Sequence, residues 1–384
     1  MTGPRTLHVV SSLMLDSGGP TQSVGQLCAA LAVLGAPAEI ATVQADRETL
    51  PLDLLTPLHT FPIATPRRLR RSPGLARFLL EEARRFDLIH VHGLWEWPGC
   101  YARRAAEASR KPLVISPRGM LEPWSLRQNR LTKHLALALW ERRNLDSAAL
   151  LHATAEMEAQ NFRILGLHNP VAVIPNGLDS PCPLPGPRAS TQRVLFLSRL
   201  HPKKGADLLL RAWARLGSKR SGWNLMIAGP DENGYQAALV AEAGRLGLGD
   251  TVKFLGPVYG DAKWDLIRGA DLFVLPSHSE NFGNVVVEAL SQGVPVITTH
   301  GTPWRDLAEK GCGWWVPTSE TALEGALAEA LALRPSGLSA MGGKGEAWSR
   351  STFSARAVAA TMLRHYQDLL DIRSHDIADP ASSA

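Results

Sequence analysis

Several common features are missing from this chain of 384 residues, and each absence excludes a class of protein. No run approaches the ~18 consecutive apolar residues of a membrane-spanning helix, so no span is expected. The N-terminal run TLHVVSSLM is short and lacks a following small-residue cleavage site, which favours a first strand over a signal peptide. The cysteines have no metal-type spacing, which indicates a reduced, cytoplasmic protein without structural zinc. They are Cys28, Cys100, Cys182 and Cys312.

Two binding motifs are also missing. The glycines after the first strand read Gly18-Gly19-Pro20 and not GxGxxG, which argues against a dinucleotide cofactor. Glycine at this place either lets the backbone approach a ligand closely or simply makes a tight turn. No acidic DxD-type triplet is evident, since Asp231-Glu232-Asn233 is a poor match, and we therefore expect no obligatory metal ion.

Size and composition indicate a globular enzyme with two domains. Apolar residues make up 45% of the chain and charged residues 20%, which are ordinary values for soluble proteins. A chain of 384 residues is too long for one ordinary core, so two domains of about 150–200 residues are expected.

Short apolar strands alternate with helical segments in both halves of the chain. In the first half, strand character is found in LHVV, AEIATV, DLIHVHG, PLVISPRG, LLHATA and VAVIPNG. In the second half, it is found in RVLFLSR, WNLMIAGP, VKFLGPV, DLFVLPS and VPVITT. This alternation predicts α/β architecture with two doubly wound, Rossmann-like domains, whose ligands bind beyond the carboxyl ends of the strands.

Composition also suggests where the domains begin and end. The stretch SPCPLPGPRASTQ contains four prolines and small polar residues, which is typical of a linker. We therefore expect a first domain over 1–180, a linker over 181–192 and a second domain over 193–352. A final helix over about 353–372 is expected to pack back on the first domain, and residues 375–384 are expected to be disordered.

Positive charge is concentrated in the first half. The formal net charge is +5, but residues 61–145 alone hold 17 Lys and Arg against 7 Asp and Glu, most densely at Arg67, Arg68, Arg70 and Arg71. This excess is either a solvated surface or an attraction to anionic lipid headgroups or to a pyrophosphate-bearing acceptor. Nucleic acid is a poorer explanation, because no recognised binding motif accompanies the charge.

The most informative stretch is DLFVLPSHSENFGNVVVE, from Asp271 to Glu288. It passes from a strand through a loop into a helix that begins near Gly283, and helix N-termini bind anions. Glu280 in the loop and Glu288 in the helix can accept hydrogen bonds from hydroxyl groups. Two carboxylates around exposed amides suit a nucleotide-sugar, with hydroxyls at both ends and phosphate in the middle. Glu288 has an alternative interpretation, as a surface residue or as the partner of a nearby cation.

Two cations follow the first strand of the second domain. Arg199 and Lys204 lie in SRLHPKKGADLLL, where they could neutralise a diphosphate leaving group. Lys203 is a rival for Lys204, and all of these cations could instead be solvated.

Candidate residues of the first domain gather after the strand DLIHVHG. His90 and His92 share one face of this strand, and only His92 lies at its exit. Trp95, Trp97 and Trp124 with Arg118 could form a sugar-binding surface, although tryptophan also packs in cores and strand histidines are often structural.

These motifs together resemble the retaining glycosyltransferases of family 4, which have the GT-B fold of two Rossmann-like domains facing across a cleft. The resemblance spans roughly Leu7 to Leu370. It is carried by the glycine pair after the first strand, by HVHG, IPNG and Lys204-Gly205, and by E-x-F-G followed by Glu288. The segments HGLW, SPRGML and TPWRDL resemble bacterial members that build exopolysaccharide or other surface glycans.

The resemblance implies a role for each matching residue. Arg199 and Lys204 would hold the donor diphosphate, Glu280 the transferred sugar and Glu288 the ribose, while His92 would be the active-site histidine. The implied catalytic group is thus His92, Arg199, Lys204 and Glu280. The remaining donor-binding residues would be Gly18, Gly19, Asn176, Phe282, Gly283, Asn284 and Glu288, and the acceptor candidates are Trp95, Arg118 and Trp124. Departures at Pro20, Asn281 and Asn284 concern the identity of the donor sugar.

The expected activity is retaining, metal-independent hexosyl transfer from a nucleotide-sugar, without a cofactor, to a glycan or lipid-pyrophosphate-linked acceptor in surface polysaccharide biosynthesis. The expected location is cytoplasmic, with possible peripheral attachment to an anionic membrane. Two other hypotheses remain open at this point. One is a nicotinamide-dependent oxidoreductase on tandem Rossmann domains, and the other is a non-catalytic carbohydrate-binding protein.

Overall fold

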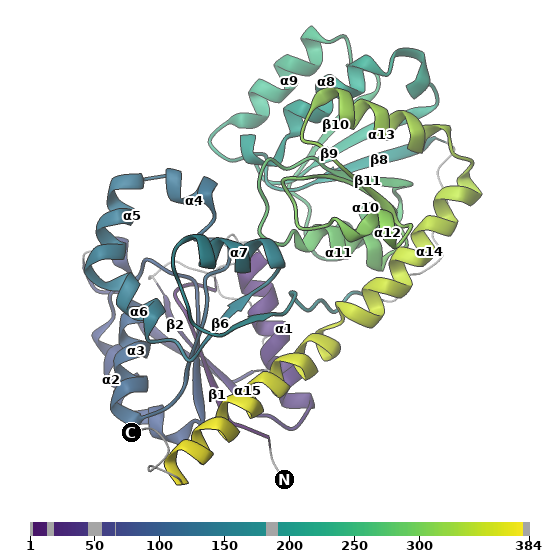
Figure 1. Ribbon diagram of the computed structural model, residues 1–384. Helices are drawn as coiled ribbons and strands as arrows, with labels where there is room; N and C mark the ends of the chain where they lie inside the picture. Colours follow the sequence, from purple (N-terminus) through teal and green to yellow (C-terminus); the bar gives the residue numbers. More distant parts are fainter. Residues whose placement is uncertain (1–2, 14–18, 45–55, 66, 182–190, 379–384) are drawn as a thin grey trace. The chain divides into compact units, whose positions relative to one another are not determined.

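A computed structural model describes the chain except residues 1–2, 14–18, 45–55, 66, 182–190 and 379–384. The chain forms two compact units (Figure 1). Unit 1 comprises Met1–Gly177 and Ala355–Ala384, and unit 2 comprises Leu178–Ser354. Gly18, Cys182 and most of the expected linker lie outside the described residues.

Unit 1 is built on a sheet of seven strands that pair in parallel, in the order β3-β2-β1-β4-β5-β6-β7. The order reverses between β1 and β4, and in open α/β sheets ligands bind at such a switch point. Both of these strands are buried along their whole length, as expected when helices cover both faces of a parallel sheet. The strands are β1 Thr6–Val10, β2 Ala38–Gln44, β3 Leu58–Pro62, β4 Leu88–His92, β5 Leu113–Ser116, β6 Leu150–Ala153 and β7 Val171–Val173.

The helices of unit 1 include the C-terminal segment of the chain. Helix α15 packs along α1, and both contribute to one apolar core through Leu27, Leu31, Met362 and Tyr366 (Figure 1). The Ser72 hydroxyl caps α2 by accepting the Leu75 N–H at 3.3 Å, and Pro73 follows at the first helical position. The helices are α1 Gly19–Val33, α2 Pro73–Glu82, α3 Trp97–Ser109, α4 Pro123–Arg127, α5 Arg130–Ala136, α6 Arg142–Asp146, α7 Glu156–Ile164 and α15 Ala355–Ala378.

Unit 2 repeats this design with six parallel strands in the order β10-β9-β8-β11-β12-β13. Its switch point lies between β8 and β11. The strands are β8 Gln192–Leu197, β9 Trp223–Ala228, β10 Val252–Gly256, β11 Leu272–Leu275, β12 Val296–Thr299 and β13 Gly313–Val316. The helices are α8 Ala206–Arg215, α9 Tyr235–Arg245, α10 Gly260–Arg268, α11 Asn284–Ser291, α12 Asp306–Glu309, α13 Glu320–Ala332 and α14 Pro335–Thr352.

The structure confirms two doubly wound parallel sheets and corrects details at the ends of segments. Helix α15 continues to Ala378, so residues 375–378, which were expected to be disordered, are helical. Gln192, expected in the linker, already belongs to β8. Among the described helices, none combines the length and apolar character that crossing a membrane requires.

Candidate active site

The two loops that leave the switch point of unit 2 lie against each other. Lys204 follows β8, Glu280 follows β11, and the Lys204 ammonium donates to a Glu280 carboxylate oxygen. The backbone joins the same loops, because the His278 N–H donates to the Lys203 carbonyl at 2.8 Å. The two charged side chains are 12% and 14% exposed. A cation and a carboxylate, both accessible from solvent, therefore stand together at the strand ends where a ligand is expected.

Gly205 makes this approach possible. Its φ is +72°, and a Cβ atom there would stand 2.1 Å from the Pro276 carbonyl oxygen. Only glycine adopts this backbone without strain and fits this gap. The residue also precedes α8, so the loop carrying Lys204 is fixed between a helix start and the β11 exit.

The loop after β11 is held by hydrogen bonds on both sides of the Glu280 side chain. The Glu280 N–H donates to the Gly301 carbonyl at 2.7 Å, and the Trp304 indole donates to the Phe282 carbonyl at 2.5 Å. The Phe282 ring is buried against Trp304, which gives it a packing role. Gly283, at φ +82°, caps α11 and Asn284 is its first residue. The helix thus presents its N-terminal amides beside Glu280.

Glu288 is buried on α11 with one half of its carboxylate satisfied. Oε1 accepts from the Lys263 ammonium of α10 at 2.8 Å, and the Glu288 side chain is 3% exposed. Oε2 is buried without a hydrogen-bond partner. Of the two interpretations of this residue, the paired carboxylate is realised, and its second oxygen has unused acceptor capacity.

Arg199 has a partner of its own, outside the Lys204–Glu280 pair. It follows β8, its side chain is 53% exposed, and its guanidinium donates to Glu232 at 2.7 Å. Glu232 belongs to the loop after β9, so the acidic segment rejected as a metal motif supplies the partner of Arg199.

In unit 1 the strand exits bring three candidates together. The Arg118 guanidinium donates to His92 Nδ1 at 3.0 Å and to Asn176 Oδ1 at 2.5 Å. His92 Nε2 and His8 Nδ1 are 2.9 Å apart, and His8 Nε2 lies 3.1 Å from the Thr6 hydroxyl. The sequence assigned Arg118 to the acceptor and Asn176 to the donor, and the structure joins Arg118 to both Asn176 and His92.

These contacts fix where the protons lie. Arg118 has donors only, so His92 Nδ1 must accept and carries no proton. His92 Nε2–H then donates to His8 Nδ1, and His8 Nε2–H donates to the Thr6 hydroxyl. Both imidazoles are therefore neutral, each with its proton on Nε2.

A second buried chain runs from α15 to the exit of β7. His152 Nε2 lies 2.8 Å from the Ile174 carbonyl, which can only accept, so His152 Nδ1 accepts from the Ser116 hydroxyl at 2.6 Å. Ser116 then accepts from His90 Nε2 at 2.6 Å, and His90 Nδ1 accepts from the Tyr366 hydroxyl at 2.6 Å. Every donor in this chain has an acceptor, which a buried polar network requires.

Burial keeps this histidine cluster uncharged. It lowers the pKa of His8 and of His152 from 6.5 to about 3, with Arg118 adding repulsion. Burial is also the main reason why the pKa of His90 and of His92 is lowered well below the usual value. Burial also lowers the pKa of Arg118 to about 10, so it remains a cation at neutral pH.

The rings of His8, His90 and His92 lie close enough together to hold a metal ion. However, all six ring nitrogens already take part in the hydrogen bonds described above. The adjacent Arg118 cation would also repel a metal. The cluster is therefore better described as a hydrogen-bond network than as a metal site.

The tryptophan candidates occupy the loops beyond β4 and β5. The Trp95 N–H donates to the buried Glu141 carboxylate at 2.8 Å, and the Lys133 ammonium lies 5.5 Å from the Trp95 ring centroid. Lys133 also donates to the Ser125 carbonyl at 2.6 Å, next to Trp124 on α4. Trp97 stacks instead on Trp140, at 6.4 Å between ring centroids. Trp95 and α4 are thus linked through Lys133, separately from the bonds of His92.

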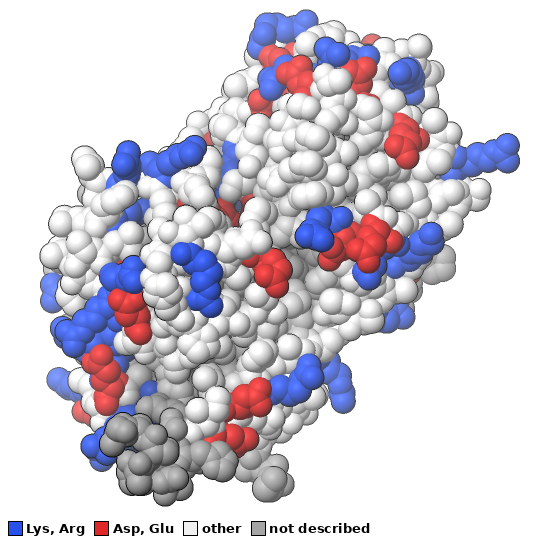
Figure 2. Space-filling model, viewed as in Figure 1, with Lys and Arg blue, Asp and Glu red and all other residues white. Residues whose placement is uncertain are grey.

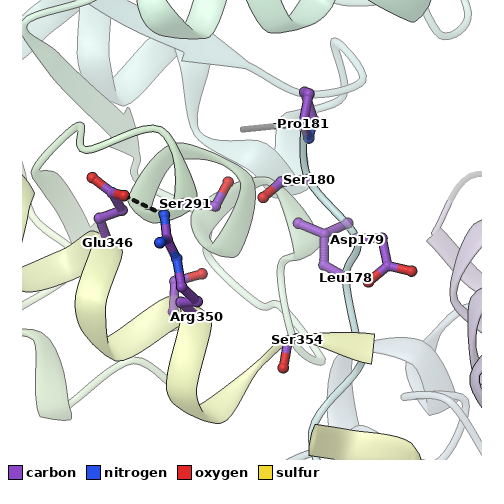
Figure 3. A pocket seen from close by; sticks show the side chains of 9 residues that line it. Leu178, Asp179, Ser180, Pro181, Ser291, Glu346, Arg350 and Ser354 are labelled. Carbon is purple, nitrogen blue, oxygen red and sulfur yellow. Dashed lines mark hydrogen bonds and ion pairs between the residues drawn. The ribbon is translucent and has the colours of Figure 1, made fainter. Parts of the chain in front are cut away.

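A cavity of about 240 Å³ in unit 2 lies elsewhere (Figure 3). Its lining is mixed polar and apolar and comes from the start of unit 2, the end of α11 and α14, where Arg350 donates to Glu346 at 2.5 Å. None of the lysine, arginine and glutamate candidates for donor binding lines it.

Several residues of these clusters were missed from the sequence. His8, Ser116 and His152 lie inside apolar strands, and the polar letters in LHVV, PLVISPRG and LLHATA were the only signal. Lys263 and Tyr366 reach their partners across 25 and 276 positions, so local patterns could not reveal them.

Comparisons with known proteins agree with this architecture. The family described as "Glycosyl transferases group 1" matches residues 186–345, and the family described as "Glycosyl transferase 4-like domain" matches residues 18–177. A D-inositol 3-phosphate glycosyltransferase of Actinosynnema mirum is 30% identical over 89% of this chain and 92% of its own length. The Mycolicibacterium smegmatis protein of that name is 35% identical over 42% of this chain and 39% of its own length.

Solved structures share the fold at lower identity. The Anabaena protein HepE in complex with UDP and glucose has a TM-score of 0.75 and 21% identity, covering 95% of this chain and 100% of that one. Sucrose-phosphate synthase from Thermosynechococcus elongatus has a TM-score of 0.77 and 18% identity, covering 96% and 100%. The oxidoreductase hypothesis falls with these matches, and the chain belongs to the group 1 glycosyltransferases, family 4, with the GT-B fold.

Proposed function

We propose that this protein is a retaining hexosyltransferase that uses a UDP-sugar. The observation that carries the proposal is the Lys204–Glu280 pair beside the N-terminus of α11, at the switch point of unit 2. The proposal of UDP is supported by the solved relatives, since HepE was solved with UDP and with UDP-glucose.

Each donor residue has a role that follows from its chemistry. Lys204, Arg199 and the amides after Gly283 would hold the diphosphate, because cations and helix N-termini attract anions. Glu280 would accept hydroxyls of the transferred sugar. Glu288 would use its unpartnered Oε2 for a ribose hydroxyl, while Lys263 keeps Oε1 in place. His92 remains the candidate active-site histidine of unit 1.

The charges suggest how transfer proceeds. As the bond between the anomeric carbon and the phosphate oxygen breaks, negative charge grows on the diphosphate and positive charge on the sugar. Preorganised cations and amides stabilise the first. An acceptor hydroxyl attacks from the same face, and its proton passes to the leaving phosphate, so the products are a glycoside and UDP. These groups supply the positive charge that a metal ion otherwise would.

The acceptor is proposed to carry a phosphate group. The basic excess of residues 61–145 favours an anionic acceptor, which has two sources. One is a lipid-pyrophosphate-linked glycan of surface polysaccharide synthesis. The other is D-inositol 3-phosphate, named for relatives such as the Actinosynnema mirum protein. Incubation with UDP-sugar and each acceptor, followed by product analysis, separates the two.

Donor identity is tested by thermal unfolding with UDP-, GDP- and ADP-sugars. A donor at 100 times its dissociation constant stabilises the protein by about 2.7 kcal/mol. The proposal requires the largest shift with a UDP-sugar. Binding without turnover on any acceptor would favour the carbohydrate-binding hypothesis, and activity that is lost on chelation and restored by a divalent cation would contradict metal independence.

The neighbouring residues Lys203 and Lys204 allow a matched test of the site. Lys204→Ala should lower kcat/KM by roughly 100-fold or more, because a preorganised charge that stabilises the transition state is lost. Lys203→Ala removes the same charge from the neighbouring position and should retain most of the activity. Equal effects of the two substitutions would contradict the assignment of Lys204 to the diphosphate.

A further inference from the structure

Three leucines on the helical segment after α4 point into solvent. Leu131, Leu135 and Leu139 are 88%, 59% and 66% exposed, and they follow one another at intervals of four residues. The segment runs from α5 through a π-helical turn, Leu137–Glu141, into α6. Soluble monomers rarely expose contiguous apolar residues of this size without a partner. We refer to these three residues as the leucine stripe.

The stripe is not a consequence of a loosely attached helix. On its other side, Ala136, Glu141 and Leu145 are buried, and Glu141 accepts from the backbone of Trp95. Lys133 ties the helix to α4 through the Ser125 carbonyl. The helix therefore has one face fixed to unit 1 and another face whose leucine side chains are exposed.

The exposed charges of residues 123–143 are all positive. Residues 123–140 contain no Asp or Glu, and exposed arginines lie at both ends, Arg127 and Arg130 before Leu131 and Arg143 after Leu139. Figure 2 shows blue side chains gathered over α4 and α5. Apolar side chains between basic ones are typical of helices that lie in the headgroup region of anionic membranes.

We propose that the leucine stripe docks unit 1 on an anionic lipid surface. The leucines would enter the boundary between headgroups and acyl chains, and the arginines would bind lipid phosphates. A second copy of the chain is a poorer partner, because a symmetric contact along the stripe would bring the flanking arginines of both copies together.

Docking here has a consequence for the acceptor side. Lys133 joins the stripe-bearing helix to Trp95 and to the residue next to Trp124. A lipid-linked acceptor held in the membrane would then reach these tryptophans without leaving it. The docking surface itself depends on the exposed leucines and the charge, and it does not require that the proposed acceptor be correct.

The test is flotation of the full chain with vesicles of phosphatidylcholine and phosphatidylglycerol, beside vesicles of phosphatidylcholine alone. The protein should float with the anionic vesicles, and added salt should weaken binding. Replacing all three leucines by serine should lower the partition coefficient by about tenfold or more, since each inserted leucine contributes to transfer from water. Arg127→Ser with Arg130→Ser should weaken binding to anionic vesicles.

Matched controls use residues of unit 1 that are equally exposed elsewhere. Val33→Ser with Ile164→Ser removes apolar side chains that are 75% and 79% exposed, and Arg356→Ser removes an exposed arginine from α15. These variants should bind like the wild type, and circular dichroism should show every variant folded. Absence of vesicle binding, or equal losses for controls and stripe variants, would overturn the proposal. So would a wild-type dimer that becomes monomeric when the leucines are replaced.

Discussion

Glu288 shows how a single buried charge connects stability with ligand binding. Its Oε1 is held by Lys263 and its Oε2 has no partner, so the site keeps one acceptor oxygen in place without a ligand. A buried carboxylate is costly unless a cation compensates it. The Lys263 side chain is therefore expected to be as important for the fold as Glu288 is for the donor.

Lys263→Met should destabilise the protein strongly, because it leaves the Glu288 charge buried and unpaired. Removing one partner of a buried ion pair costs about 3–5 kcal/mol, and urea unfolding measures it. The double substitution Lys263→Met with Glu288→Gln should recover part of the loss. Lys253→Met removes an exposed lysine of β10 and serves as the control. If Lys263→Met and Lys253→Met have the same free energy of unfolding, the ion pair does not stabilise the fold.

Arg118 determines the tautomer of His92, and this can be observed directly. Arg118→Lys keeps a group that only donates, so His92 should still carry its proton on Nε2. Arg118→Met removes the donor and should allow the Nδ1-protonated form, with a loss of about 1–3 kcal/mol for the unsatisfied nitrogen. Nitrogen chemical shifts of the imidazoles distinguish the forms. Identical spectra for both variants would show that His8 alone sets the tautomer.

At the residue level, the sequence singled out individual positions but not the partners that the structure gives them. The face shared by His90 and His92 follows from strand alternation, and their rings stack at 4.1 Å. The partners His8 and Tyr366 depend on strand order and on the return of α15, which no local pattern encodes. For the same reason Arg118 and Asn176 were assigned to different ligands although they bond to each other.

At the scale of elements, the loops after β8 and β11 can lie against each other because Gly205, at their contact, has no side chain. Gly205→Ala should destabilise unit 2 by roughly 3 kcal/mol, since it combines a left-handed backbone with overpacking against the Pro276 carbonyl. Gly222→Ala is the matched control. Gly222 has φ +82° with open space where a Cβ atom would lie. Alanine there should therefore cost only the strain of the left-handed backbone, about 1–2 kcal/mol. Equal losses in thermal unfolding would mean that the Pro276 contact relaxes easily.

Strands were easier to predict than the segments between them. Runs such as LHVV and DLFVLPS are apolar and β-branched because helices cover both faces of each sheet. Strand β3, LHTFP, was not predicted, since its half-buried edge position gives it no continuous apolar pattern. The turn Leu137–Glu141 was also invisible in sequence, because a π-helical turn differs from an α-helix only in its hydrogen bonds.

At the scale of the whole molecule, the two sheets have the same order around their switch points, β2-β1-β4-β5 in unit 1 and β9-β8-β11-β12 in unit 2. The alternation of strands and helices predicted two doubly wound sheets, although the edge strands β3 and β13 were not among the predicted strands. The C-terminal helix α15, far from unit 1 in sequence, completes that unit by packing on α1 and by binding His90 through Tyr366.

The buried histidines of unit 1 make the stability of the protein depend on pH. His8 and His152 have a pKa of about 3 in the folded protein and the ordinary 6.5 when unfolded. Below 6.5 the unfolded chain binds more protons, so the stabilisation is fully present above that pH and is lost progressively as the pH falls toward 3. Between about pH 6.5 and about pH 5, each of these histidines should lower the free energy of unfolding by about 2 kcal/mol.

Urea unfolding at these two pH values measures the effect, with His8→Asn as the diagnostic variant. Asparagine does not titrate, so this variant should lose less stability on acidification, even if it is less stable at neutral pH. Glu141 and Glu158 oppose the trend, because burial raises the pKa of each carboxyl group and favours the folded state at low pH. Both remain in the variant, so the difference between the two proteins isolates the histidine. If the wild type and His8→Asn lost the same free energy of unfolding on acidification, His8 would become protonated in the folded protein. The arrangement of protons described for the histidine network would then be wrong.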